Sequence, residues 1–127
     1  MNKKWFVALA FLVCSILLTT TASAANTIID QSTVTLGPGE SLKYTRVINV
    51  PDGAYLGVYF DDKTDGAYGN EYFLVKSVNT NDIVTFGKED FNRVMGVPAG
   101  SYVMMLECYD PNLSCSATGS LSAQYKN

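Results

Sequence analysis

The chain has 127 residues, of which 17% are charged, and nine basic residues against twelve acidic ones give a net charge of −3. It contains no histidine, which excludes a Ser-His-Asp or Cys-His nucleophile system and histidine ligands to a metal. The basic residues form no run or patch, so we expect no nucleic-acid partner.

Residues 1–24 have the pattern of a secretory signal peptide. Lys3 and Lys4 precede an apolar run over residues 5–18, and small residues at 22–24 supply a cleavage site. The run is shorter than the roughly 20 apolar residues of a membrane-spanning helix, so we expect cleavage and no membrane span in the mature form. Residues 25–127 then form a single secreted domain, whose net charge changes from −3 to −5 because Lys3 and Lys4 are lost.

Residues 25–127 alternate apolar and polar side chains with the period of a β-strand, and turn residues interrupt the pattern about every ten positions. No segment there sustains a helical period. The pattern predicts an all-β, antiparallel, jelly-roll-like β-sandwich of about eight strands. The predicted strands are 28–36, 41–50, 54–60, 72–77, 83–86, 91–97, 101–109 and 120–125.

Two of these strands make specific predictions about their faces. Strand 41–50, taken as continuous, places four apolar side chains together: Leu42, Tyr44, Ile48 and Val50. Strand 54–60 places Tyr55 and Tyr59 on the face opposite Leu56 and Val58, away from the predicted core.

A short internal repeat marks two turns. "VPDGAYLGV" begins at Val50 and "VPAGSYVMM" begins at Val97, so both read Val-Pro-x-Gly-small-Tyr. Proline suits the second position of a tight turn, and glycine accepts the positive φ that a type II turn needs. We expect two similar hairpin turns, each leading into a core strand.

The segment "YFDDKTDGAYGNEYF", residues 59–73, combines carboxylates, glycines and tyrosines. Its Asp-Gly and Gly-Asn pairs favour a polar hairpin loop between two strands. An EF-hand calcium loop is excluded, because Lys63 occupies the third ligand position and Tyr72 the twelfth. A looser calcium site stays open, because irregular loops can supply the oxygens that calcium takes. Its candidate ligands are Asp61, Asp62, Asp65 and Glu71.

Four tyrosines in and beside this segment form a candidate ligand-binding set: Tyr55, Tyr59, Tyr68 and Tyr72. Exposed tyrosine rings stack on sugar rings, and their hydroxyls form hydrogen bonds. The alternative is that these rings only pack on a pleated surface, which is the commoner reason for aromatic residues in strands.

The cysteines predict a structural disulfide. Cys14 leaves with the leader, and Cys108 and Cys115 remain as an even pair in an oxidising compartment. A zinc site would need about four ligands, and the chain has no histidine to complete one. A C-x-x-C redox spacing is absent from the sequence.

Four segments, within residues 33–125, together resemble the bacterial pre-peptidase C-terminal domain: "LGPGESLKYTRVINVPDGAYLGVYF", "EYFLV", "VPAGSYVMMLECY" and "GSLSAQY". The shared features are the first strand after a glycine-bounded turn, the two Pro-x-Gly turns and a closing strand that ends in an aromatic residue. The resemblance implies a β-sandwich module of the kind that is appended to secreted enzymes. Some modules of this family assist substrate binding or bind calcium. This chain differs in carrying no enzyme segment, and in having Glu71 where the family usually has aspartate, so the family's calcium site is not transferred.

These observations predict a secreted, non-enzymatic binding module whose partner is an extracellular polysaccharide or protein. One alternative is a protein-directed factor, such as a protease inhibitor, that presents the loop 109–117 on its disulfide. Another is a surface module stabilised by calcium, which is the one cofactor considered. Glycoside hydrolysis would need two carboxyl groups about 5–9.5 Å apart, and the sequence places no such pair, so no catalytic residue is predicted.

Overall fold

The structure is a computed structural model, which describes residues 25–63, 70–110 and 112–127. The predicted leader, residues 1–24, lies outside these residues, as do Asp65 and Tyr68. None of the described residues forms a helix that is long and apolar enough to cross a membrane.

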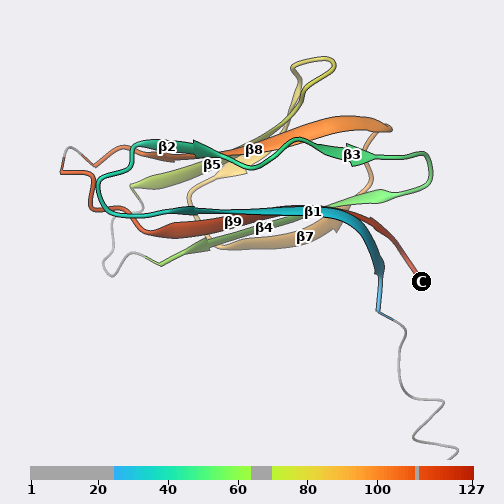
Figure 1. Cartoon of the computed structure of the whole chain (residues 1–127), viewed down its shortest axis with the longest axis horizontal. Helices are drawn as coiled ribbons and strands as arrows, with labels where there is room; N and C mark the ends of the chain where they lie inside the picture. Colours follow the sequence, from blue (N-terminus) through green and yellow to red (C-terminus); the bar gives the residue numbers. More distant parts are fainter. Residues whose placement is uncertain (1–24, 64–69, 111) are drawn as a thin grey trace, which may run out of the picture.

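The described residues form nine strands in two antiparallel sheets that pack face to face (Figure 1). Sheet A has the order β1-β9-β4-β7, and sheet B has the order β2-β8-β5-β6 with β3 also paired to β8. The strands are β1 Thr27–Leu36, β2 Leu42–Tyr44, β3 Ile48–Val50, β4 Tyr55–Asp62, β5 Glu71–Ser77, β6 Ile83–Gly87, β7 Phe91–Met95, β8 Gly100–Cys108 and β9 Ala117–Tyr125. The predicted antiparallel β-sandwich is confirmed.

The core lies between the inner faces of the two sheets, as the alternation predicts. In β4, the side chains of Leu56, Val58 and Phe60 are fully buried, while Tyr55 and Tyr59 face outward. Phe60 of sheet A contacts Phe73 of sheet B, with ring centroids 4.7 Å apart. The apolar periodicity of the strands therefore places the two sheets on one shared core.

The predicted continuous strand 41–50 is wrong, because it is divided into β2 and β3. Tyr44 pairs with Met105 and Ile48 pairs with Tyr102. The segment from β2 to β3 therefore advances four residues where β8 advances three. One extra residue forms a bulge and reverses which face each side chain takes. Thr45 turns inward there and its hydroxyl accepts the Met104 N–H at 3.0 Å. Leu42 and Tyr44 consequently face outward, whereas Ile48 and Val50 are buried.

The two Val-Pro-x-Gly segments are crossovers between the sheets, so the prediction of hairpin turns is wrong. The first joins β3 of sheet B to β4 of sheet A, and the second joins β7 of sheet A to β8 of sheet B. They lie side by side, because Val50 pairs with Gly100 (Figure 1). In the first turn Ala54 N–H donates to Pro51 O at 3.1 Å and Gly53 has φ 80°, so proline takes the first turn position.

The segment after β4 is also a crossover, and the predicted hairpin loop is wrong. β4 pairs with β7 and β9 in sheet A, whereas β5 pairs with β6 and β8 in sheet B. Period-two patterning locates strands, but it does not assign consecutive strands to the same sheet.

Candidate binding face

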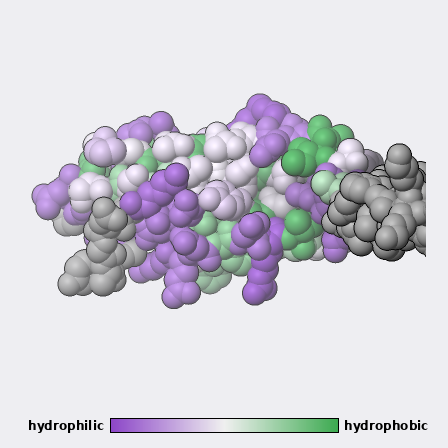
Figure 2. All heavy atoms as spheres, turned by 90° about the horizontal axis from the view of Figure 1, so that it is seen from below, coloured by the Kyte–Doolittle hydropathy of each residue, from purple (hydrophilic) through white to green (hydrophobic). Residues whose placement is uncertain are grey.

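The outer face of sheet A carries neutral polar side chains in rows across its strands. Alternation along β4 brings Tyr55, Gly57 and Tyr59 to this face. One row is Thr33, Ser120, Tyr59 and Asn92, and the next is Gln31, Ser122 and Gly57. Figure 2 views the molecule from this side and shows hydrophilic and neutral residues over most of it. We call this surface the polar face.

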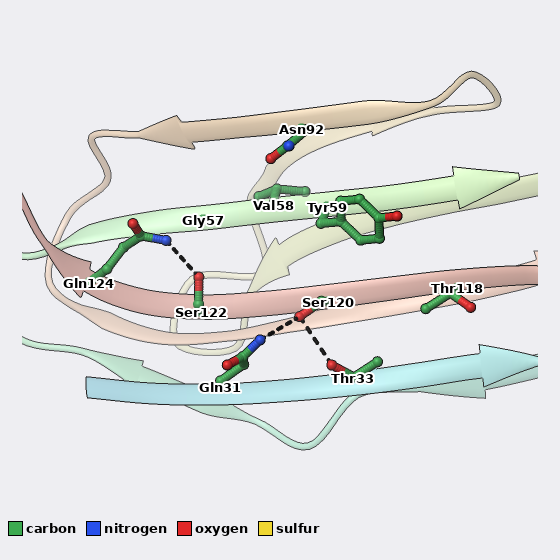
Figure 3. A pocket seen from close by; sticks show the side chains of 10 residues that line it. All are labelled: Gln31, Thr33, Gly57, Val58, Tyr59, Asn92, Thr118, Ser120, Ser122 and Gln124. Atoms are coloured by element: carbon green, nitrogen blue, oxygen red, sulfur yellow. Dashed lines mark hydrogen bonds between the residues drawn. The ribbon is translucent and has the colours of Figure 1, made fainter. Parts of the chain in front are cut away.

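A shallow hollow of about 290 Å³ lies in the polar face (Figure 3). Its lining residues are Gln31, Thr33, Gly57, Val58, Tyr59, Asn92, Thr118, Ser120, Ser122 and Gln124. All of the polar groups among them are uncharged hydroxyls and amides. The hollow can therefore offer both hydrogen-bond donors and acceptors to a ligand without desolvating a charge.

Hydrogen bonds between neighbouring side chains hold the hollow's polar groups in place (Figure 3). Thr33 Oγ1 donates to Ser120 Oγ at 3.2 Å, and Gln31 Nε2 donates to the same oxygen at 3.5 Å. Gln124 Nε2 donates to Ser122 Oγ at 2.8 Å. Ordered side chains lose less conformational entropy when a ligand binds.

Gly57 lies at the centre of this arrangement. A Cβ atom there would lie 2.3 Å from Ser122 Oγ and 2.4 Å from Gln124 Nε2. These distances are shorter than van der Waals contact, so a side chain at this position would displace the Ser122 and Gln124 groups, which occupy the space above the glycine backbone. The Ser122 and Gln124 groups therefore lie between Tyr55 and Tyr59, which are about 13 Å apart along β4.

The two ends of β4 have opposite charge on this face. At one end the Lys126 ammonium lies over the Tyr55 ring, 4.3 Å from its centroid. At the other, the Tyr59 hydroxyl donates to Asp61 Oδ2 at 3.3 Å. Partial burial, followed by the Asp61 charge, raises the pKa of Tyr59, so its phenol is neutral at physiological pH and keeps its proton as a donor.

The four predicted binding tyrosines do not share one surface. Tyr59 lines the hollow and is 39% exposed, and Tyr55 lies on the same face beneath Lys126. Tyr72 belongs to the outer face of sheet B, where its ring lies 6.3 Å from Phe86 and 6.0 Å from Tyr109. Tyr68 is outside the described residues. Among the three of these tyrosines that the structure describes, Tyr59 is therefore the most exposed to a ligand.

The predicted calcium ligands are also divided. Asp61 and Asp62 are consecutive in β4, so alternation turns them to opposite faces, and Asp61 is paired with Lys63 at 3.9 Å. Asp62 lies near Glu71, and Asp65 is outside the described residues. No group of three or more acidic or cysteine side chains that could hold a metal occurs within the described ranges. Calcium binding stays a prediction, with Glu71 and Asp62 as its two neighbouring ligands.

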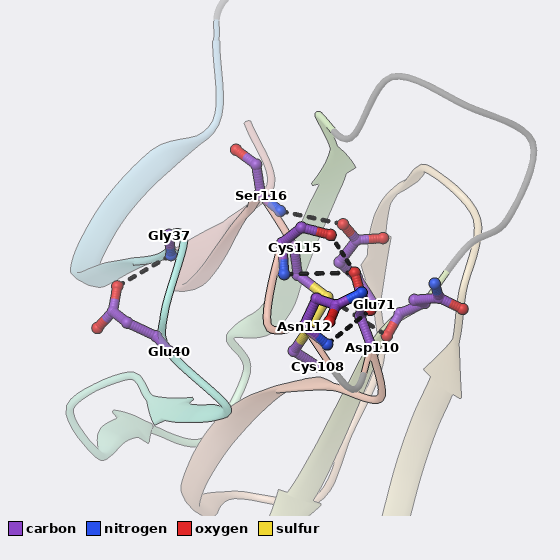
Figure 4. Close-up of a disulfide and its surroundings, with 10 residues drawn as sticks. Gly37, Glu40, Glu71, Cys108, Asp110, Asn112, Cys115 and Ser116 are labelled. Carbon is purple, nitrogen blue, oxygen red and sulfur yellow. Dashed lines mark hydrogen bonds between the residues drawn. A yellow bond between two sulfur atoms is a disulfide. The ribbon is translucent and has the colours of Figure 1, made fainter.

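Glu71 is buried beside the disulfide, with 1% of its surface exposed. Its Oε1 atom accepts the Ser116 N–H at 3.0 Å (Figure 4), while its Oε2 atom has no donor within the described structure. Burial, and then the nearby Asp62 carboxylate, raises the pKa of Glu71, although the Ser116 amide acts in the opposite direction. A proton shared with Asp62 would supply the missing donor.

The predicted disulfide joins Cys108 and Cys115, with Cα atoms 5.8 Å apart (Figure 4). Within the loop it closes, Asp110 accepts the Asn112 N–H at 3.0 Å and the Ser114 N–H at 3.3 Å, as well as the Ser114 hydroxyl. Leu113 O accepts the Gly39 N–H at 2.7 Å, which ties the loop to the turn before β2. The loop is thus held at both its base and its tip.

Sequence reasoning did not identify the hydroxyl and amide rows of the polar face. Thr33, Asn92 and Ser120 each alternate with apolar residues in a predicted strand. This alternation is the sequence signal that could have placed them on an outer face. Their alignment depends on β9 lying between β1 and β4, which connects residues nearly 90 positions apart, such as Thr33 and Ser120.

No protein-family model matches the chain, and no curated protein matches its sequence significantly. Among solved structures, the pre-peptidase C-terminal domain of a collagenase from Bacillus anthracis matches with a TM-score of 0.48 and 16% identity. The match covers 77% of this chain and 88% of that chain. That structure is of the same domain type that the sequence motifs resemble.

Proposed function

We propose that this protein is an exported, non-catalytic binding module that holds a neutral polysaccharide on the polar face. The observation that carries the proposal is the hollow beside Tyr59, lined by uncharged hydroxyl and amide groups. A pyranose ring presents hydroxyls at its edge and C–H groups on its faces. The polar rows match the edge, and the tyrosine ring matches a face.

The charge of the polar face favours a neutral ligand over an ionic one. Carboxylates and a lysine lie at opposite ends of β4, and the hollow between them is lined by uncharged groups. An anionic or cationic polymer would meet one end of like sign wherever it lay along the strand.

Export and lack of catalysis belong to the same proposal. The leader pattern of residues 1–24 and the disulfide both fit an oxidising compartment outside the cytoplasm. The hollow's polar groups are hydroxyls and amides, which lack the general acid and base that glycoside hydrolysis needs. The module therefore binds its polysaccharide and leaves it intact.

Substitution of Tyr59 by alanine tests the proposal. The mature chain is assayed against a panel of insoluble neutral polysaccharides by depletion from solution, with affinity measured for any that binds. Tyr59→Ala removes the stacking ring and should weaken binding about tenfold, since aromatic contacts contribute about 0.5–1.5 kcal/mol beyond buried area. The matched control is Tyr125→Ala, whose side chain is also 39% exposed but does not line the hollow, and which should bind as the wild type does. Equal binding by a folded Tyr59→Ala variant would contradict the proposal.

A protein-directed role for the disulfide loop is the second candidate. Its support is the rigidity of the loop, in which Asp110 holds the backbone at 112 and 114 while Tyr109 projects with its side chain exposed. Inhibition of a protease that is lost in a Cys108→Ser/Cys115→Ser variant, and kept in Tyr59→Ala, would favour this role over polysaccharide binding.

A further inference from the structure

The outer face of sheet B is apolar, in contrast to the polar face on sheet A. Large hydrophobic side chains from all four paired strands lie on it: Leu42, Tyr44, Leu74, Ile83, Phe86 and Met105. Phe86 is 63% exposed, Ile83 is 58% exposed and Tyr44 is 52% exposed. We call this surface the apolar face. Contiguous exposed apolar side chains of this kind mark interaction surfaces.

Two half-buried charges of opposite sign lie within the apolar face. Glu107 pairs across the strands with Tyr72, and Lys76 pairs with Val103, so they are one strand apart and four residues apart along the strand direction. That places them about 14 Å from each other, too far for an ion pair within one chain. The ion pairs of the described residues are Lys43–Glu40, Arg46–Asp30 and Lys63–Asp61, none of which uses either charge.

This charge pattern is self-complementary under two-fold symmetry. A two-fold axis lying in the interface, and perpendicular to the line from Glu107 to Lys76, brings Glu107 of each copy over Lys76 of the other. Met105 and Leu74 are cross-strand neighbours midway between the two charges, so they fall on the axis. The line is tilted about 20° from the strands, so the strands of the two copies cross at about 40°, close to the roughly 30° of aligned sheet packing.

We propose that the protein forms a symmetric dimer through the apolar face, with two Lys76–Glu107 ion pairs across the interface. A second copy is the occupant that fits, because it supplies both an apolar sheet and the opposite charge at each end. The face measures about 20 Å by 20 Å from strand spacing and rise, so both copies together bury roughly 800 Å², which is below the roughly 1,200 Å² of stable interfaces and within the range of weak, transient ones. The dimer is consequently weak and concentration-dependent.

The dimer does not depend on the proposed function, but it would strengthen it. The polar face lies on the opposite side of each sandwich from the apolar face, so both polar faces of a dimer point outward. Two sites on one particle can engage neighbouring polysaccharide chains, and linked binding raises the apparent affinity without any new contact.

Charge reversal tests the dimer on the mature chain with its disulfide intact. Sedimentation velocity between about 5 µM and 500 µM should show a monomer–dimer equilibrium in this weak range. Lys76→Glu and Glu107→Lys should each raise the dimer Kd at least tenfold, because each places like charges together twice. The double reversal, Lys76→Glu/Glu107→Lys, should restore the wild-type Kd within about threefold, since the pairs re-form with their signs exchanged.

The controls separate this interface from loss of the fold and from other contacts. Circular dichroism and melting temperature confirm that each variant is folded, and Lys126→Glu, a matched reversal beside the polar face, should leave the Kd unchanged. Phe86→Ser should weaken the dimer through lost apolar contact. A folded wild type that stays monomeric at 500 µM overturns the proposal. The proposal is also overturned if neither single reversal changes the dimer Kd, or if the double reversal does not return the Kd to the wild-type range.

Discussion

At the scale of single residues, Thr45 and Glu71 are two of the polar side chains that the fold buries. Thr45 is buried and completes the hydrogen bonding of Met104 at the bulge. Glu71 is buried beside the disulfide with one oxygen that lacks a donor in the described structure. An unsatisfied buried acceptor costs about 1–3 kcal/mol, so Glu71 reduces stability whenever it is ionised.

Glu71 predicts a specific dependence of stability on pH. Its pKa is raised in the folded state, so the folded protein binds the proton more tightly than the unfolded chain does. Its stabilising contribution is complete below the unfolded pKa of about 4.3 and is lost as pH rises through the folded pKa. Glu71→Gln should therefore be more stable than the wild type at pH 7, by about 1 kcal/mol, and of similar stability at pH 4.

Urea unfolding at pH 4 to 8 measures this difference, with a chelator and then calcium added in parallel. Calcium bound by Glu71 and Asp62 would raise the stability of the wild type alone. A wild-type midpoint that is the same with calcium and with chelator removes the calcium prediction. A Glu71→Gln variant that is less stable at pH 7 contradicts the argument from burial.

At the scale of elements, the chain uses its connections to move between sheets. Six connections between the described strands, those after β1, β3, β4, β6, β7 and β8, carry the chain to the opposite sheet. Among the nine strands that the structure describes, β5 and β6 are the one consecutive pair that is also hydrogen-bonded within a sheet. The loop between β8 and β9 is one of these crossovers, and the disulfide closes it. The loop's tip bonds to Gly39 and its end bonds to Glu71, so this element joins parts of both sheets.

Removal of the disulfide should destabilise the domain without changing its fold. Closing so short a loop restricts the unfolded chain and contributes about 2–3 kcal/mol. Cys108→Ser/Cys115→Ser, which avoids a lone thiol, should lower the free energy of unfolding by that amount. Chemical denaturation of the two proteins without reductant gives the measurement. An equal midpoint would mean that Asp110 and the Gly39 contact fix the loop without help from the disulfide.

At the scale of the whole molecule, the first and last strands are paired over their full length. β1 pairs with β9 from Thr27 and Tyr125 to Leu36 and Ala117, and Asn26 bonds to Gln124 at 2.8 Å. β9 also pairs with β4, so it is a central strand of sheet A. The polar face is therefore assembled from both ends of the chain and its middle, and it forms only when the whole domain folds.

This topology predicts slow folding for a domain of its size. Contacts between distant parts of the chain require loop closure before they gain any stabilising energy, and sandwiches with such pairing fold in milliseconds to seconds. Stopped-flow refolding of the disulfide-intact mature chain, followed by tyrosine fluorescence, should give a main phase in that range. A main phase in microseconds would show that the long-range pairs are not limiting.

The sequence by itself determined the strand-rich class, the inward phase of β4, and the pairing of the two cysteines that remain beyond residue 24. These follow from local alternation and from counting, which need no knowledge of distant neighbours. Tertiary structure decided what depends on register. The single extra residue at Thr45 turned Leu42 and Tyr44 outward, and the placement of β9 between β1 and β4 aligned Thr33, Ser120 and Tyr59. A shift of one residue reverses every side chain of a strand, so the two outer faces, and the sites proposed on them, are fixed only when the sheets assemble.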